Sequence, residues 1–254
     1  MSTTGFDLKG KRALICGASG GIGQACARLL AQTGARLFIS GTQDAKLGPL
    51  SAELSGLGAQ CAPLAMNLTE EGEPERLVAA AEAEMGGLDI LVNAMGINRP
   101  QPALEVTGEN WDAVLDINLR SLFFACQAAG RRMVAQGYGR IVNISSQTGT
   151  VAIPLRAAYC ASKAGVDQLT KELALEWAPK GVTVNAVAPT FVETPFVVEM
   201  FKDPDFKKFV LDSIPVGRMA TPEEIAHAVL YLASDQAAIV TGHVLLVDGG
   251  WTIK

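Results

Sequence analysis

Residues 11–34 read KRALICGASGGIGQACARLLAQTG, and they carry the clearest fold signal in the chain. The apolar beginning predicts a short buried strand, and the end predicts a helix. The turn between them, residues 17–23, holds four glycines. Glycine tolerates positive φ and lets backbone N–H groups approach a phosphate at a helix N-terminus. The order of strand, glycine turn and helix therefore favours a nucleotide-binding turn over a tight turn that binds nothing.

The alternation of strand and helix continues to the end of the chain. Further apolar runs predict strands at residues 36–40, 60–65, 88–92, 139–144, 182–187 and 244–247. Helical patterns cover residues 44–58, a segment starting at Thr69, and residues 110–136, 159–177 and 222–233. Residues 191–219 contain three prolines and are expected to form an irregular substrate loop. We therefore expect an α/β protein: one domain over residues 1–254, a Rossmann fold whose doubly wound parallel sheet carries helices on both faces.

Composition excludes several functional classes. The 254 residues carry a net charge of −5 without a basic run, so we expect no nucleic-acid partner. No apolar run approaches the ~18 residues of a membrane span, and residues 1–5 do not resemble a signal peptide. The five cysteines match neither a metal nor a disulfide framework. We expect a soluble cytoplasmic protein without a metal site.

Tyr159 and Lys163 stand four residues apart in a helical segment. Such residues share one helix face, so an ammonium would lie beside a phenol and favour its ionised form. A phenol with a lowered pKa can exchange protons near neutral pH. The spacing alone more often marks a solvated or interface face. Support comes from Asn93, Ser146 and Pro189, which end predicted parallel strands and must gather with the glycine turn at one sheet edge, where ligands bind in such folds.

Together these residues closely resemble the short-chain dehydrogenase/reductase family. The motif Gly17-x-x-x-Gly21-x-Gly23 is similar to the family's cofactor turn. Pro189 and Thr194 are similar to its nicotinamide-contacting segment, and residues 248–250 to the end of its last strand. The resemblance covers almost the whole chain. It implies a catalytic tetrad of Asn118, Ser146, Tyr159 and Lys163.

The resemblance implies hydride transfer between a nicotinamide and a carbonyl or alcohol carbon. Tyr159 would be the acid/base, and Lys163 would lower its pKa and hold the nicotinamide ribose. Ser146 would polarise the substrate oxygen, and Asn118 would hold a water that links Lys163 to solvent. The implied cofactor-binding residues are Gly17, Ser19, Gly20, Gly21, Ile22, Gly23, Gly41, Thr42, Asn67, Leu68, Asn93, Ala94, Gly96, Tyr159, Lys163, Pro189, Val192 and Thr194.

The cofactor preference depends on the end of the second strand. Gly41 and Thr42 stand where an acidic residue would bind the adenosine ribose and repel a 2′-phosphate. The missing acid permits NADP. No Lys or Arg follows at residues 41–43 to hold the phosphate, so the sequence favours NADP only weakly and NAD stays open.

Three departures from the family pattern affect the surroundings of the cofactor. Ala94 and Met95 stand where the family usually has Asn and Ala, and Asn67 replaces a common Asp that touches adenine. Thr190 replaces a common Gly, and a β-branched residue takes positive φ only at high cost. We expect adenine binding to survive, the loop after Pro189 to differ locally, and the enzyme to be active.

Substrate identity is the least determined property. Residues 95–102, 147–156 and 191–215 should line the pocket, and residues 96–100 and 203–206 resemble the sugar-acid and polyol dehydrogenase branch, with gluconate 5-dehydrogenase the nearest type. Besides Ser146 and Tyr159, the residues offered to a hydroxylated or anionic substrate are Arg99, Gln147, Thr148 and Arg156. The alternative is that both arginines are solvated. A 3-oxoacyl-thioester reductase and a non-catalytic nucleotide-binding scaffold are the competing functions.

The resemblance also implies a homotetramer. Its interfaces would use the helices around Asn118 and Tyr159 and the C-terminal strand. The apolar positions Leu169, Leu173 and Trp177 fit a buried helix pair between subunits and fit an ordinary core equally well. Trp251 could pack on a neighbouring subunit.

Overall fold

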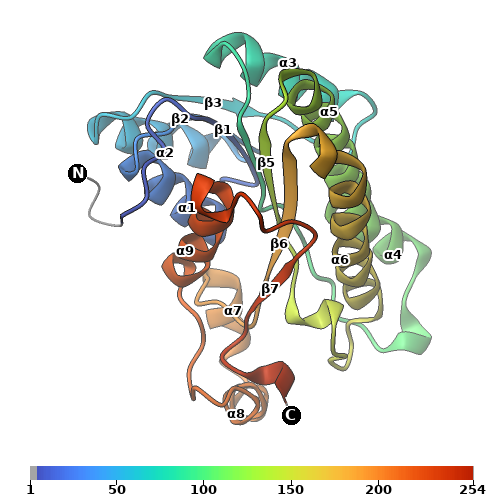
Figure 1. Cartoon of the computed structure of the whole chain (residues 1–254). Helices are drawn as coiled ribbons and strands as arrows, with labels where there is room; N and C mark the ends of the chain where they lie inside the picture. Colours follow the sequence, from blue (N-terminus) through green and yellow to red (C-terminus); the bar gives the residue numbers. More distant parts are fainter. Residues whose placement is uncertain (1–4, 254) are drawn as a thin grey trace.

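A computed structural model shows one parallel sheet with helices on both faces (Figure 1). It describes residues 5–253, and for residues 195–196 the backbone only. The sheet order is β3-β2-β1-β4-β5-β6-β7. The strands are β1 Arg12–Cys16, β2 Arg36–Gly41, β3 Cys61–Ala65, β4 Ile90–Asn93, β5 Gly139–Ile144, β6 Val182–Pro189 and β7 Val244–Val247. All seven predicted strands are present, so the doubly wound α/β prediction is confirmed.

The helices form two layers. The α-helices are α1 Gly21–Gln32, α2 Asp44–Gly56, α3 Glu73–Met85, α4 Gly108–Leu115, α5 Ser121–Gln136, α6 Ala157–Trp177, α7 Pro195–Met200, α8 Pro204–Ser213 and α9 Pro222–Ala233. Helices α1, α2 and α9 cover one face, and α3, α5 and α6 cover the other (Figure 1).

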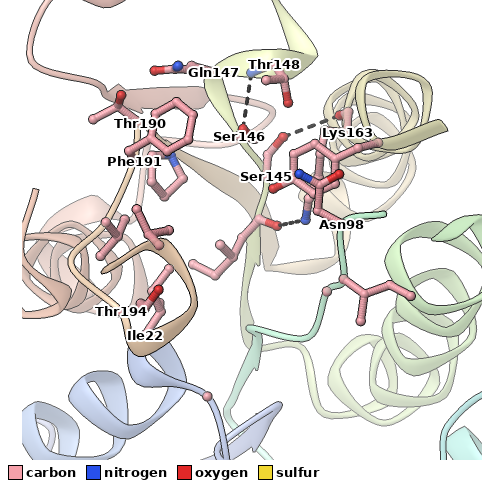
Figure 2. A pocket seen from close by; sticks show the side chains of 18 of the residues that line it. Ile22, Asn98, Ser145, Ser146, Gln147, Thr148, Lys163, Thr190, Phe191 and Thr194 are labelled. Atoms are coloured by element: carbon pink, nitrogen blue, oxygen red, sulfur yellow. Dashed lines mark hydrogen bonds between the residues drawn. The ribbon is translucent and has the colours of Figure 1, made fainter. Parts of the chain in front are cut away.

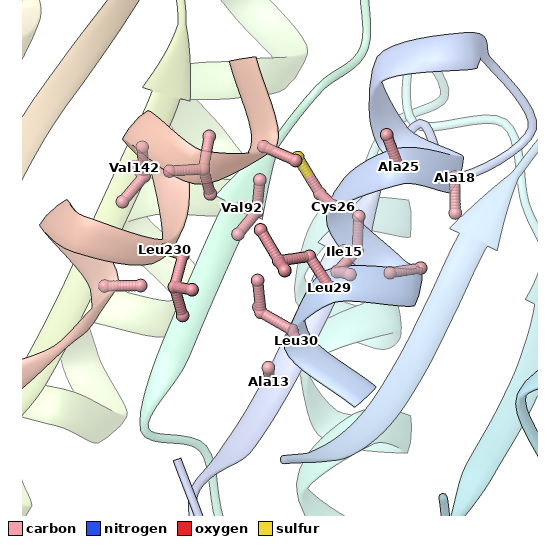
Figure 3. Close-up of a cluster of buried hydrophobic side chains, with 14 of the residues drawn as sticks. Ala13, Ile15, Ala18, Ala25, Cys26, Leu29, Leu30, Val92, Val142 and Leu230 are labelled. Atoms are coloured by element: carbon pink, nitrogen blue, oxygen red, sulfur yellow. The ribbon is translucent and has the colours of Figure 1, made fainter. Parts of the chain in front are cut away.

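Side chains of the central strand β1 point alternately into the two hydrophobic cores, one on each face of the sheet. Ala13 and Ile15 of β1 face the layer of α1 and α9, whereas Leu14 and Cys16 face α3 and α5. Successive side chains of a strand point to opposite faces, so a strand covered on both sides must be apolar throughout. Figure 3 shows Ile15 of β1 packing with Leu29, Leu30 and other side chains of the first layer.

Two predicted helices need correction. The helix expected from Thr69 begins at Glu73, after a turn whose Gly72 has a φ of +80°. The helix expected over residues 110–136 is divided by a π-turn, Asp116–Arg120.

Residues 191–219, expected to be irregular, contain α7 and α8. Their prolines misled the prediction because Pro195 and Pro204 lie in the first turns, where a proline loses no helical hydrogen bond. The Asp203 carboxylate caps α8 by accepting from the backbone N–H groups of Asp205 and Phe206.

The chain order places the site. β1 lies between β2 and β4, so the direction of winding reverses there. Ligands bind beyond the carboxyl ends of the strands at such a switch point. The glycine turn follows β1 directly, and the segment from Ala94 follows β4.

Candidate active site

A cavity of about 450 Å³ opens at the carboxyl edge of the sheet. Its walls come from the glycine turn, the ends of β4, β5 and β6, the beginning of α6, and α7 (Figure 2). It brings together many of the site residues expected from the sequence: Gly20, Gly21, Ile22, Ala94, Gly96, Ser146, Gln147, Thr148, Arg156, Tyr159, Lys163, Pro189, Val192 and Thr194.

The glycine turn is packed too closely for larger residues. Gly17 has a φ of +82°, and a Cβ there would lie 2.6 Å from the carbonyl carbon of Ala94. A Cβ on Gly23 would overlap the carbonyl oxygen of Gly17. The N-cap of α1 is Gly20, and no side chain caps its first turn. Backbone N–H groups and the helix dipole are thus available to a phosphate group, so this cradle fits a dinucleotide.

Lys163 is held inside the protein. It is 2% exposed, and its Nζ donates to the carbonyl oxygen of Ile144 at 2.8 Å. The same nitrogen lies 5.7 Å from the ring centroid of Tyr159. Burial lowers the pKa of Lys163 to about 8, and the nearby Asp167 carboxylate acts in the opposite direction. The ammonium is therefore poised to lose its proton in mildly alkaline solution.

Tyr159 is half-buried in the cavity wall, and desolvation there raises the pKa of its phenol. Hydrogen bonding to Ser146 and the positive charge of Arg156 act in the opposite direction. The Ser146 hydroxyl also accepts from the backbone N–H of Thr148 at 3.2 Å (Figure 2). The groups that lower the pKa of Tyr159 in this structure are Ser146 and Arg156. A lowering of this pKa by Lys163 therefore stays a prediction.

Asn118 lies in the π-turn and is fully buried. Its Oδ1 accepts from the Ile97 N–H at 2.8 Å, and its Nδ2 donates to the Ile97 carbonyl at 2.9 Å and to Ser162 Oγ at 3.0 Å. The amide thereby ties the segment after β4 to α6. π-turns inside helices often mark functional sites. The predicted water relay through Asn118 stays a prediction.

Some predicted residues lie outside the cavity lining. Asn93 is a core amide that donates to Asn143 Oδ1 at 2.9 Å and joins β4 to β5. Asn67 accepts from Thr69 within its own turn. Arg99 is exposed and donates to Asn110 Oδ1 at 2.6 Å, so the structure does not bring it to the pocket. The others outside the lining are Gly17, Ser19, Gly23, Gly41, Thr42, Leu68 and Asn118.

The cavity lining includes Gln147 and Thr148, which the sequence analysis offered to the substrate, and also Asn98 and Thr190, which it did not assign as site residues. Within the part of the chain that the structure describes, four lining residues each have a buried side-chain oxygen without a hydrogen-bond partner: Asn98, Gln147, Thr148 and Thr190. Asn98 stood inside the expected range 95–102 but had no motif to single it out. Thr190 was noted only as a departure, and it does avoid positive φ.

The C-terminal tryptophan packs within its own chain. The Trp251 ring centroid lies 5.7 Å from that of Phe191 and 5.8 Å from that of Phe209. This aromatic cluster lies beside the pocket, and the packing of Trp251 on a neighbouring subunit stays a prediction. Leu169, Leu173 and Trp177 likewise pack in the chain's own core.

Comparison with known proteins identifies the family. The family model described as enoyl-(acyl carrier protein) reductase matches residues 17–252. D-threitol dehydrogenase of Mycolicibacterium smegmatis is 42% identical over 98% of this chain and 95% of that protein. The chain belongs to the short-chain dehydrogenase/reductase family. It is an oxidoreductase that acts on alcohols and ketones with a nicotinamide cofactor.

Two further members of this family are similar. The 3-oxoacyl-[acyl-carrier-protein] reductase of Thermotoga maritima is 39% identical over 97% of this chain and 99% of that protein. The solved gluconate 5-dehydrogenase of Burkholderia cenocepacia, in complex with NADP and tartrate, superimposes with a TM-score of 0.94. It is 34% identical, with 98% of each chain covered. Both competing substrate classes are thus represented.

The described residues add two observations. None of their helices combines the length and apolar character needed to cross a membrane. Across residues 5–253, no group of three or more His, Cys, Asp or Glu side chains is placed to bind a metal ion.

Proposed function

We propose that this protein interconverts a secondary alcohol and a ketone on a polyhydroxylated substrate, namely a sugar, sugar acid or polyol. The observation that carries the proposal is the polar part of the cavity lining, to which Asn98, Ser146, Gln147, Thr148 and Thr190 contribute side chains beside Tyr159. A few polar side chains placed in a concave site fix the orientation of a ligand through hydrogen bonds. Several hydroxyl groups on neighbouring carbons are suited to this lining.

The tetrad supplies the proton chemistry. When bound, the nicotinamide accepts or supplies the hydride. Tyr159 takes the hydroxyl proton during oxidation and returns it during reduction. Ser146 donates a hydrogen bond to the same substrate oxygen and stabilises the charge that develops there. Lys163 holds the ribose and, when protonated, favours the phenolate form of Tyr159. Asn118 fixes the segment after β4 against α6. It also holds the water that links Lys163 to solvent.

We propose NADP as the preferred cofactor. A Cβ on Gly41 would lie 2.7 Å from Ser19 Oγ, so β2 closes directly onto the glycine turn without an acidic side chain between them. No carboxylate at Gly41 or Thr42 would repel a 2′-phosphate. NADP in the similar gluconate 5-dehydrogenase supports this choice.

The competing substrate is a 3-oxoacyl thioester. The reductase of Thermotoga maritima supports it, and so do the apolar lining residues Ile153, Val197 and Met200. A non-catalytic scaffold is less consistent with the site, because a scaffold does not need all four tetrad residues.

A substrate screen separates these functions. Nicotinamide absorbance would be followed with sugars, sugar acids, polyols and 3-oxoacyl thioesters, each with NAD and NADP. We expect turnover of hydroxylated substrates and little turnover of thioesters. Activity confined to thioesters would refute the sugar proposal, and cofactor binding without any turnover would support the scaffold.

We further propose a cytoplasmic homotetramer. Trp111 of α4, Phe124 of α5 and Leu175 of α6 are 40%, 38% and 76% exposed on the helix layer around Asn118 and Tyr159. Exposed apolar side chains on these three helices are available to a subunit interface. All five cysteines are free thiols, as expected in a reducing compartment. Light scattering should give four times the chain mass, and a monomer mass would exclude the tetramer.

A further inference from the structure

Arg156 is a buried cation in the wall of the substrate cavity. The residue is 6% exposed. Its Nη1 donates to the carbonyl oxygen of Pro154 at 2.9 Å. No carboxylate within residues 5–253 forms an ion pair with it, whereas Arg12 and Arg140 are paired with Asp89 and Asp235. A buried charge without a counter-ion is costly, and this cost lowers the pKa of Arg156.

The backbone before Arg156 adopts an uncommon conformation. Leu155 has a φ of +66°, and it is the one non-glycine among the described residues with positive φ. Its carbonyl oxygen accepts from the Gln101 N–H at 2.9 Å, and Gln101 forms a bridge with Arg156. Such conformations persist where surrounding structure enforces them and occur often at ligand sites. The two loops that flank the cavity are thus joined at the residue that leads into Arg156.

Two aromatic rings fix the guanidinium. It lies 5.5 Å from the ring centroid of Phe206 and 5.9 Å from that of Phe191, both within cation–π range. These rings meet edge to face with centroids 5.7 Å apart, and Trp251 supports Phe191 from behind. The rings add no negative charge that could neutralise the guanidinium.

We propose that Arg156 determines specificity by binding an anionic group, a carboxylate or a phosphate, on the polyhydroxylated substrate. This inference rests on the proposed function and narrows its substrate class. A guanidinium pairs with either oxyanion through two parallel hydrogen bonds, and a neutral polyol cannot supply the missing charge. Arg156 precedes Tyr159 by three residues at the start of α6. Side chains with this spacing are neighbours, so the anion lies a few carbon–carbon bonds from the carbon that reacts.

A second role must be distinguished from this one. The charge of Arg156 also favours the ionised form of Tyr159 and so lowers its pKa. If Arg156 acted only through Tyr159, its loss would slow charged and neutral substrates alike and would move the pH profile. If Arg156 binds the anion, its removal should raise KM and lower kcat/KM for charged substrates only.

The test compares gluconate, glucitol 6-phosphate and uncharged glucitol as substrates of the wild type, Arg156→Gln and Arg156→Lys. The exposed Arg99, bonded to Asn110, supplies the control Arg99→Gln. We expect the wild type to prefer a charged substrate. Arg156→Gln should lower kcat/KM for that substrate on the order of 100-fold and change the neutral one only a few-fold. Arg156→Lys should retain part of the preference. The two charged substrates identify carboxylate or phosphate.

A second measurement uses the wild-type protein, so its result does not depend on whether a variant folds. Malonate should compete with the substrate, whereas its uncharged diamide should not. The inference is overturned if glucitol is used as well as the charged substrates, if Arg156→Gln affects all three equally, or if Arg99→Gln has the same effect. Turnover of thioesters alone would instead refute the proposed function itself.

Discussion

At the scale of single residues, burial controls the proton chemistry of the site. Lys163 is buried and Tyr159 is half-buried, and desolvation favours the neutral form of each side chain. Partners partly restore the charged forms: Ser146 and Arg156 for the tyrosine, Asp167 for the lysine. Removing a partner should therefore change the pH dependence as well as the rate.

Tyr159→Phe should reduce turnover of every accepted substrate by about 10²–10⁴-fold, because the acid/base proton is lost while the ring remains. Cofactor affinity, measured by fluorescence titration, should change little. Unchanged turnover would show that Tyr159 is not the acid/base.

Asp167→Asn should move the alkaline limb of the kcat/KM profile to lower pH. The Asp167 carboxylate raises the pKa of Lys163, so without it the ammonium loses its proton at lower pH. The charged groups that act on Asp167 are Lys163 and Lys171, and Ser145 donates to it. The measurement covers pH 6–10 with a saturating cofactor. A limb that stays in place or moves to higher pH would contradict this coupling.

At the scale of elements, the glycine turn and α1 are built as one unit. The turn after β1 folds back so tightly that Gly23, inside α1, touches the backbone of Gly17. Thr194 also approaches Gly21, since a Cβ there would lie 3.0 Å from its Cγ2. The start of α1, the glycine turn and the segment around Thr194 therefore depend on one another.

Gly23→Ala should destabilise the protein by about 1–3 kcal/mol or more, since the new methyl group overlaps a backbone carbonyl that cannot rotate away. The matched control is Gly56→Ala at the end of α2, where a Cβ meets nothing within 4 Å. Alanine there should be neutral or stabilise by up to about 1 kcal/mol. Urea unfolding measures both, and equal effects would refute the packing argument.

At the scale of the whole molecule, the sheet order concentrates function at one edge. In sequence, 73 residues lie between the end of β1 at Cys16 and the start of β4 at Ile90. In space the two strands are neighbours, and Cys16 pairs with Asn93. The cavity draws its lining from segments between Gly20 and Met200. A ligand that bridges these segments should stabilise the entire fold.

Addition of NADP should therefore raise the melting temperature. At a concentration 100 times its Kd, a ligand stabilises the native state by about 2.7 kcal/mol. NAD at the same concentration should produce a smaller shift if the preference for NADP is correct. A larger shift with NAD would reverse the cofactor proposal, and no shift with either would argue against the cradle.

The sequence alone determined the order of strands and helices along the chain and the spacing of the tetrad residues. Strand and helix periods are local, so all seven strands could be predicted, and a Tyr and a Lys four apart share a helix face whatever surrounds them. Glycine positions also report local backbone needs. The prolines of α7 and α8 were misleading because a proline tolerated in a first turn looks the same in sequence as one that breaks a helix.

Tertiary structure alone decided which of two similar residues reaches the pocket. Asn93 ties β4 to β5, whereas Asn98 lines the cavity. Arg99 is exposed, whereas Arg156 is buried between Phe191 and Phe206. The surroundings of a side chain depend on segments far away in sequence, and no local pattern records their packing. For that reason the chemistry could be predicted from the sequence, while the features that select the substrate emerged only from the fold.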